Sequence, residues 1–207
     1  MKIFALFTLL FCVATAGGQK DSDVDNEGNS IRRLHRTRST DTVEDWVSKR
    51  GAFSTLVSVL VAAGLAPDGV LDGDGAFTLF APTDNAFART FATYPGVDEV
   101  LVNDPEGALT QVLTYHVLAQ EVLSGDIPRS GVTVSTAQGD SLTAFKQCYW
   151  WWAWLVCGIG LKDGSPDIAW VTHPDRLASN GVVHAIDKVL IPPSLAPTVE
   201  GLRAPGH

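Results

Sequence analysis

Two histidines and two aspartates are the residues of this chain whose types could support acid–base chemistry. His116 lies on the apolar stripe of an expected helix, His184 lies inside an apolar segment, and Asp84 and Asp187 lie close to other apolar runs. A lone histidine in such a place is more often a hydrogen-bonded core residue than a ligand or a catalytic base. The sequence also has no Gly-x-Ser-x-Gly, His-Glu-x-x-His or Cys-x-x-Cys motif. We therefore expect a protein that is not an enzyme and needs no cofactor.

A short acidic stretch, Asp72-Gly73-Asp74-Gly75, is similar to the start of a calcium-binding loop. The segment lacks the bidentate glutamate and the ligand spacing that such a loop requires. We interpret it as an acidic turn and expect no metal site.

The first residues have the order of a secretory signal peptide. Lys2 supplies a positive charge, an apolar run extends from Ile3 to Val13, and Ala14-Thr15-Ala16 is a small-x-small cleavage site. The run is too short to span a bilayer as a helix, and no later segment has about 18 uninterrupted apolar residues. The sequence thus predicts a signal peptide over 1–16 and a secreted product of the extracellular matrix or cell wall, without a membrane span.

The use of cysteine agrees with secretion. Cys12 falls within the expected signal peptide, which leaves Cys148 and Cys157 in an oxidising compartment, where two cysteines usually pair. On one continuous strand these two residues would be about 30 Å apart, far beyond disulfide reach. Pairing therefore requires the chain to fold back between them, and we expect a disulfide and such a reversal.

Between these cysteines lies a segment rich in tryptophan. Trp150, Trp151, Trp152 and Trp154 occupy four of five consecutive positions. They cannot all face one side of a strand, because neighbouring side chains point to opposite faces. We predict that this segment binds a partner, by stacking on polysaccharide or packing against protein; extra core packing inside the domain is the alternative interpretation.

Residues 17–41 contain few apolar side chains and predict a disordered arm, because such a segment cannot offset the entropy cost of ordering. Within the arm, the stretch Arg32-Arg33-Leu34-His35-Arg36 has three interpretations. It is a dibasic processing site, a solvated basic stretch, or a signal that resembles the Arg-x-Leu-Arg translocation motif of oomycete effectors, with His35 in the last position.

The charge of the chain argues against nucleic acid as a partner. Residues 42–207 hold 9 basic and 18 acidic side chains, while the charges of the arm balance. A net charge of this sign repels phosphate backbones, and no compact cluster of Lys and Arg is visible.

The first half of the expected domain reads as helical. The spacing of Phe53, Leu56, Val57, Leu60 and Val61 predicts a helix that ends at Gly64, with caps at Asp41 or Thr42 and a possible break at Gly51. Further helices are expected near Thr83, over 97–102, and over 105–115 with Asp104 as its cap.

The second half reads as short strands. Runs rich in Val, Thr and aromatic residues, separated by Gly and Pro, cover 132–136, 142–145, 159–162, 168–172 and 182–191. Helices first and strands later, without regular βαβ alternation, predict the α+β class. We expect one domain over 42–193, ended by Pro192-Pro193, and a polar tail over 194–207.

Three motifs in a fixed order resemble the fasciclin domain family. They are Thr78-Leu79-Phe80-Ala81-Pro82-Thr83-Asp84-Asn85-Ala86-Phe87, then Tyr115-His116-Val117, then the segment from Ala178 to Pro193, which includes Asn180-Gly181, His184 and Asp187. The resemblance spans about Trp46 to Pro193. It implies a wedge of twisted β-sheet packed with helices, with the first and last motif strands as central neighbours and the Tyr115–His116 pair supporting the fold.

The resemblance also bears on partners. Some animal fasciclin proteins present an Asp-Ile pair to integrins just before the last motif. Here the pair is Asp175-Arg176, so Asp175 is a candidate partner-binding residue in a changed context, or a turn residue. We expect an adhesion module that binds an extracellular protein or polysaccharide. The alternatives are a secreted effector, suggested by 32–36, and a carrier whose pocket for a small apolar ligand is lined by the tryptophan segment.

Overall fold

The structure is a computed structural model of the 207-residue chain. It describes residues 38–65, 76–103, 107–151 and 154–204, without the side chains of Val102 and of 149–156. The expected signal peptide, nearly all of the expected arm and the acidic turn at Asp72 therefore lie outside the described residues, and these expectations stay predictions.

The helices confirm most of the expected boundaries. They are α1 (Val43–Ser48), a 3-10 turn (Gly51–Phe53), α2 (Ser54–Ala62), α3 (Asp84–Thr93), α4 (Val97–Asn103), α5 (Ala108–Tyr115) and α6 (Ala196–Glu200). The hydroxyl of Thr42 accepts from the Asp45 amide and caps α1, and the hydroxyl of Thr83 accepts from the Ala86 amide and caps α3. The expected break at Gly51 is present.

Two helical features differ from expectation. Helix α5 begins at Ala108, after Gly107 in the left-handed conformation (φ 76°), while the expected cap Asp104 lies outside the described residues. Helix α6 forms within the segment that was expected to be only a polar tail. It is held by Val199, which is buried, and by the Tyr94 hydroxyl, which donates to Glu200 at 2.8 Å. Five residues are too few for a periodic pattern to announce such a helix.

The strands form one mixed sheet of seven. They are β1 (Phe77–Pro82), β2 (Val117–Leu118), β3 (Val132–Ser135), β4 (Ser141–Trp151), β5 (Trp154–Lys162), β6 (Ala169–Ala178) and β7 (Gly181–Ile186), in the order β2-β1-β7-β6-β5-β4-β3. Strands β1 and β7 pair in parallel, from Phe77 opposite Gly181 to Pro82 opposite Ile186, and the other pairs are antiparallel. The α+β class and the adjacency of the two motif strands are confirmed.

The last strand is shorter than the sequence predicted. Strand β7 ends at Ile186, whereas a strand was expected over 182–191. Beyond that point the backbone amides of Leu190 and Ile191 donate to His116 Nε2 (2.9 Å) and to an Asp163 carboxylate oxygen (2.7 Å) instead of to a neighbouring strand. Side-chain acceptors thus take the place of the backbone hydrogen bonds of a sheet. The pattern of residue types along this segment does not show which acceptor an amide will find.

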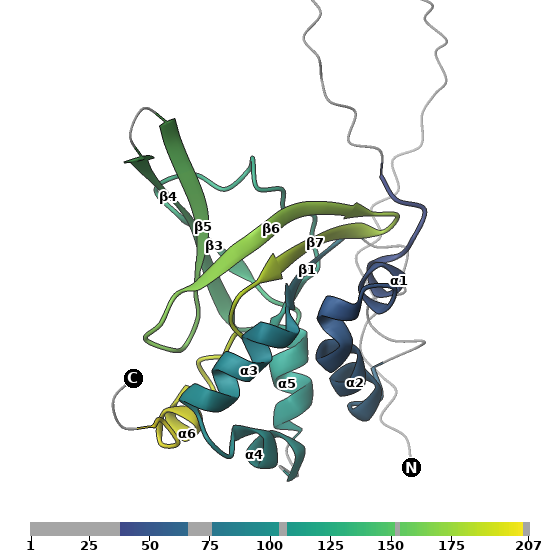
Figure 1. Ribbon diagram of the computed structural model, residues 1–207, viewed down its shortest axis with the longest axis vertical. Helices are drawn as coiled ribbons and strands as arrows, with labels where there is room; N and C mark the ends of the chain where they lie inside the picture. The colour runs from purple at the N-terminus through teal and green to yellow at the C-terminus, as the bar shows by residue number, and fades with distance from the viewer. Residues whose placement is uncertain (1–37, 66–75, 104–106, 152–153, 205–207) are drawn as a thin grey trace, which may run out of the picture. The chain divides into compact units, whose positions relative to one another are not determined.

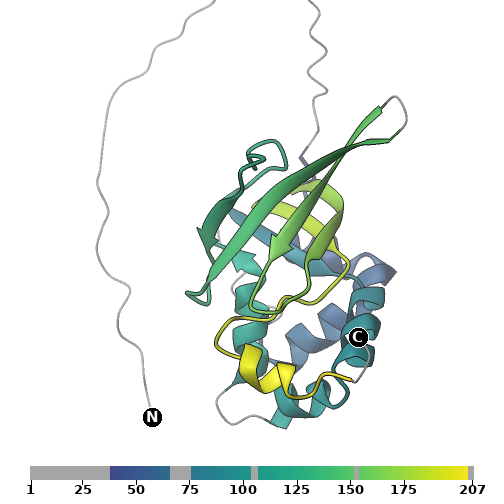
Figure 2. The ribbon, with the colours of Figure 1, turned by 90° about the vertical axis from the view of Figure 1, so that its left-hand side faces the viewer.

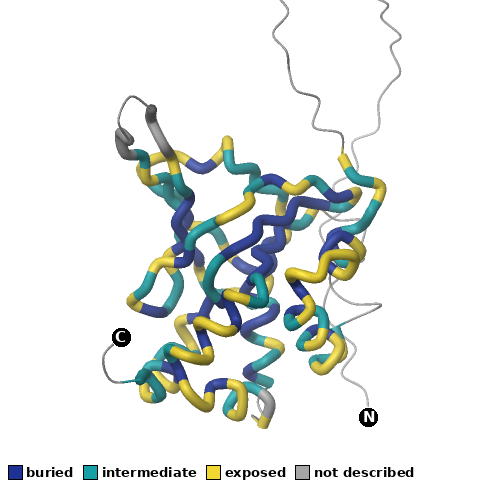
Figure 3. Tube along the Cα trace, viewed as in Figure 1, coloured by how far each residue is buried: buried dark blue, intermediate teal, exposed yellow. Residues whose placement is uncertain are grey.

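The central strands separate two apolar cores. Leu79, Ala81 and Val183 pack with residues of α1 and α2, while Phe80 and Ile186 pack on the other face with residues of β4, β5 and β6. Figure 1 shows α1, α2, α3 and α5 gathered at one side of β1 and β7, and Figure 3 shows the continuous burial of these strands. All six residues of β7 are buried. A strand covered on both faces needs a nearly continuous apolar run, which β7 has apart from the hydrogen-bonded His184.

The first residue of β7 leaves no room for a side chain. A Cβ on Gly181 would lie 2.2 Å from the carbonyl oxygen of Phe77, which is backbone and cannot move aside without breaking the parallel pair. We predict that Gly181→Ala lowers the free energy of unfolding by about 3 kcal/mol, measured by urea titration. Gly51→Ala is the matched control, because a Cβ there meets nothing within 4 Å. Equal stability of the two variants would contradict the placement of Gly181.

Candidate functional site

His116, the first candidate for chemistry, is fully engaged inside the protein. Its Nδ1 donates to the carbonyl oxygen of Val112 at 2.7 Å, and its Nε2 accepts from the amide of Leu190 at 2.9 Å. Burial lowers the pKa of His116 to about 4. The ring is therefore neutral at physiological pH and ties the end of α5 to the chain that follows β7.

His184 lies within β7 and has a similar role. Its Nδ1 accepts from the Asp175 amide at 3.0 Å, so its Nε2 carries the proton and donates to the carbonyl oxygen of Val122 at 2.8 Å. The ring stacks on Phe80 with centroids 5.6 Å apart. Both nitrogens serve the backbone, as the interpretation of a core histidine predicted.

The Asp175 side chain makes hydrogen bonds within the protein. The residue has φ +54°, the one positive value among the described residues other than glycine. One carboxylate oxygen accepts from the Ser124 amide at 2.6 Å and the other from the Ser124 hydroxyl. Asp175 thus anchors the 122–124 segment beside β6, and its neighbour Arg176 is the exposed residue. A role of Asp175 in binding a partner stays a prediction.

The two motif aspartates also serve the backbone. Asp84 accepts from the Thr55 amide and the Ser54 hydroxyl, both at 2.8 Å, and so caps the start of α2. Burial raises the pKa of Asp84, but these hydrogen bonds outweigh that effect and hold the pKa below its ordinary value. Asp187 accepts from the Trp170 amide at 2.7 Å and lies 3.6 Å from Arg89. Each carboxylate has its own partners, and none of these contacts joins it to His116.

The remaining motif residues make contacts between distant segments. The side-chain oxygen of Asn180 accepts from the Val43 amide at 2.9 Å, and the Tyr115 hydroxyl donates to the carbonyl oxygen of Ser141 at 3.0 Å. The motif therefore fastens α1 to the turn between β6 and β7, and α5 to β4.

A further, half-buried carboxylate was missed by the sequence reasoning. Asp163 accepts from the amide and hydroxyl of Ser165 and from the Ile191 amide, and burial raises its pKa. Lys188 donates to the Ser165 hydroxyl. The turn residues Asp163-Gly164-Ser165 were the available signal, since Asp and Ser commonly bond to nearby backbone in turns. In the described part of the chain no three His, Cys, Asp or Glu side chains form a group that could hold a metal ion.

The outer part of the β4–β5 hairpin is not paired with any other described strand. Strand β3 pairs with β4 only over Ser141–Ala144, and β6 pairs with β5 only at Gly160 and Leu161. The residue pairs from Lys146–Ile159 to Trp151–Trp154 therefore pair only with each other, without β3 or β6 beside them. Figure 2 shows this hairpin running out beyond the rest of the sheet.

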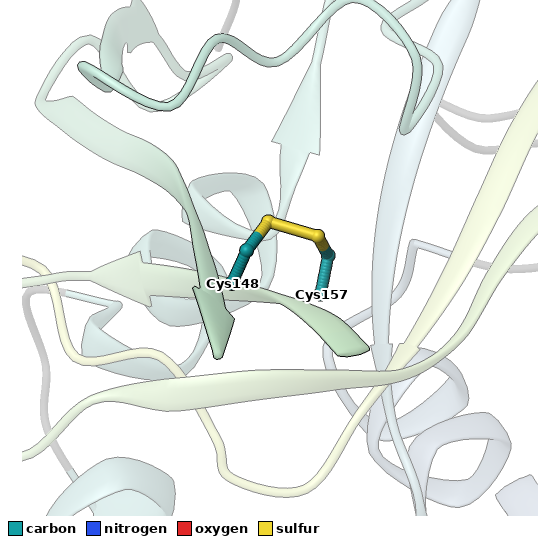
Figure 4. The surroundings of a disulfide bond; sticks show 2 residues. All are labelled: Cys148 and Cys157. Atoms are coloured by element: carbon teal, nitrogen blue, oxygen red, sulfur yellow. A yellow bond between two sulfur atoms is a disulfide. The ribbon is translucent and has the colours of Figure 1, made fainter. Parts of the chain in front are cut away.

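The predicted disulfide is present and crosses the hairpin. Cys148 lies directly opposite Cys157, with Cα atoms 4.0 Å apart and sulfurs bonded (Figure 4). The expected reversal is thus a hairpin of two long strands. Trp150, Trp151 and Trp154 lie on these strands, but their side chains and Trp152 are outside the described residues, so their contacts stay a prediction.

Comparison with known proteins identifies the family. Residues 51–192 match the fasciclin domain family. This chain is a member of the fasciclin domain family. The match covers most of the chain and includes the first and last motif strands.

Relatives and solved structures agree with this assignment. The chain is 36% identical to protein sll1483 of Synechocystis, over 81% of this chain and 82% of that protein. It is 31% identical to the transforming growth factor-beta-induced protein ig-h3 of Sus scrofa, over 75% of this chain but 20% of that protein. A pair of FAS1 domains from the insect cell adhesion molecule Fasciclin I has the same fold, with a TM-score of 0.58 and 18% identity, over 74% of this chain and 52% of that chain.

The described part of this fasciclin domain has no helix with the length and apolar character that crossing a bilayer requires. The disulfide fits an oxidising compartment.

The buried neutral His116 predicts a pH dependence of stability. Its pKa is about 4 in the folded protein and 6.5 in an unfolded chain. Below pH 6.5 the unfolded state therefore binds the proton first, so this contribution is complete above pH 6.5 and is lost as pH falls towards 4, by about 3 kcal/mol. Urea titrations between pH 7 and 4 and histidine NMR titrations measure it.

The control for this prediction is the exposed His173. His173→Gln should keep the pH dependence of the wild type, whereas His116→Gln should be less stable at pH 7 and lose less stability on acidification. A His116 resonance that titrates near pH 6.5 in the folded protein is incompatible with the burial described.

The disulfide predicts a local effect. The double variant Cys148→Ser, Cys157→Ser should raise the exchange rates of the Gln147 and Gly158 amides at least about tenfold, because rungs without neighbouring strands open locally. The free energy of global unfolding should fall by about 2–3 kcal/mol, because the bridge restricts the unfolded chain over a short loop. Hydrogen exchange followed by NMR gives both values, and unchanged protection of these amides would show that the bridge does not hold the hairpin.

Proposed function

We propose that this fasciclin domain is a secreted, non-enzymatic adhesion module that binds an extracellular protein or polysaccharide of the matrix or cell wall. The observation that carries the proposal is the β4–β5 hairpin, which continues past both neighbouring strands and is closed by a disulfide. The family and the description of Fasciclin I as a cell adhesion molecule support it.

The polar residues of the motifs support a non-catalytic role. His116, His184, Asp84 and Asp175 direct their polar atoms to backbone groups or to serine hydroxyls of the same chain. A general base must reach the proton that it abstracts from a substrate, and atoms already committed to the framework are poorly suited to that task. Binding through an outer element requires no such group.

The tryptophans are the residues through which we propose that the hairpin binds. Trp150, Trp151, Trp152 and Trp154 supply large amphipathic surfaces suited to stacking on sugar rings or packing on protein. Tryptophan is also enriched among the residues that dominate binding energy at protein interfaces. The bridge between Cys148 and Cys157 reduces the entropy that the hairpin loses on binding, because it ties the strands together beforehand. The effector alternative rests on residues 32–36, outside the described residues, and stays a prediction.

The test replaces the four tryptophans by Ser and Thr. Mature protein and variant are immobilised and incubated with extracellular matrix and cell-wall fractions, and captured protein and glycan are quantified. The variant should capture its partner at least about tenfold less efficiently, the effect of losing one dominant contact residue or more.

A matched control removes exposed apolar surface elsewhere. Val61 and Ile168 are 60% and 40% exposed, so the double variant Val61→Thr, Ile168→Thr should bind like the wild type. Undiminished capture by a folded tryptophan variant would falsify the proposed contact.

A further inference from the structure

A narrow apolar cavity lies among the helices, away from the elements that form the hairpin. Its volume is about 80 Å³, and it is bounded by α2, α3, α4, α5 and the chain after β7. Its described lining is apolar apart from Thr90, Asp98 and His116. The carrier interpretation of the sequence placed an apolar pocket at the tryptophan segment, whereas this cavity is made by helices.

The polar side chains in the cavity wall offer water little to bind. The Thr90 hydroxyl donates to the carbonyl oxygen of Ala86 at 2.9 Å and accepts from the Val189 amide at 3.4 Å. Both nitrogens of His116 are bonded to backbone, and the ring is neutral. A buried water needs two to four polar partners, and apolar cavities remain dry. The cavity is therefore suited to an apolar occupant.

The size of the cavity selects a thin occupant. An engineered apolar cavity of about 150 Å³ holds benzene, and the volume here is about half of that. A straight alkyl chain has a smaller cross-section than a ring and gains favourable transfer free energy for each methylene that enters.

The rim determines which head group such a chain can carry. Phe91 is 38% exposed and lies beside Phe87, with ring centroids 6.0 Å apart. Asp98, in the first turn of α4, is exposed. Since His116 is neutral, Asp98 is the one charged side chain among the described lining residues. A carboxylate or phosphate head at this rim would be repelled, whereas an amine or quaternary ammonium would be attracted.

We infer that this fasciclin domain binds the alkyl chain of a single-chain amphiphile with a cationic head group, with the chain among the helices and the head beside Asp98. The site uses none of the hairpin residues. Binding of the alkyl chain and capture of an extracellular partner are therefore separable, and either can fail without the other.

The test uses octyltrimethylammonium, octanol and octanoate as probes, each below its micelle concentration. Methyl NMR spectra of the intact mature protein give affinities and identify the contacted Leu and Val residues. Octyltrimethylammonium should shift the methyl signals of Leu101 and Val112 and bind about fivefold more tightly than octanoate, the discrimination expected from one exposed carboxylate. From methyl- to butyltrimethylammonium chains the affinity should rise up to about fourfold per methylene and then level off towards octyl, because a cavity of about 80 Å³ is filled by the first few carbons.

Three variants separate the cavity from unspecific binding. Leu101→Trp places a large ring at the half-buried mouth and should abolish binding while the protein stays folded. Ile168→Trp adds the same ring at an exposed position outside the cavity lining and should bind like the wild type. Asp98→Asn should retain binding but lose the preference for the cation over octanoate.

The outcomes decide the inference. Loss of binding in Leu101→Trp alone, together with loss of charge preference in Asp98→Asn, supports it. Absence of shifts with octyltrimethylammonium, tighter binding of octanoate, or equal binding by a folded Leu101→Trp variant overturns it.

Discussion

The parallel pairing of β1 and β7 is the constraint on which the rest of this fasciclin domain depends. These strands run side by side from Phe77 and Gly181 to Pro82 and Ile186, and their alternate side chains supply both apolar cores. The pair needs close backbone approach at its start, which Gly181 permits, and burial on both faces, which its apolar composition permits. Both motif histidines are then fixed by this pair: His184 is part of β7, and His116 holds the chain that leaves it.

This arrangement explains why the histidines and aspartates that look reactive in the sequence make structural hydrogen bonds instead. Strands β1 and β7 are parallel and so cannot be joined to each other by a hairpin turn, and the segments near their ends are held by other groups. Here the holding groups are side chains: Asp84 caps α2, Asp187 binds the Trp170 amide, and Asp175 binds Ser124. Polar groups buried in a framework are costly unless they are bonded, and these are bonded to backbone or hydroxyl partners.

The sequence predicted the parts of this structure that depend on local signals or on the motifs. The helix starts near Thr42 and Thr83, the break at Gly51, the α+β class and the adjacency of the motif strands all followed from them. It did not predict the end of β7 at Ile186 or the Asp163 cluster, because both depend on side chains that meet only after the chain has folded. The apolar cavity was also out of reach, since a void is a property of packing among five segments and not of any one pattern.

We expect β1 and β7 to form the most stable part of the domain, and the outer part of the β4–β5 hairpin, which has no neighbouring strands among the described residues, to be less stable. Native-state hydrogen exchange across the backbone tests it most directly. The amides of Leu79–Ala81 and Val182–Ala185 should exchange only through global unfolding, with protection equal to the full free energy of unfolding. Protection of these central amides no greater than that of Gln147 and Gly158 would contradict the account.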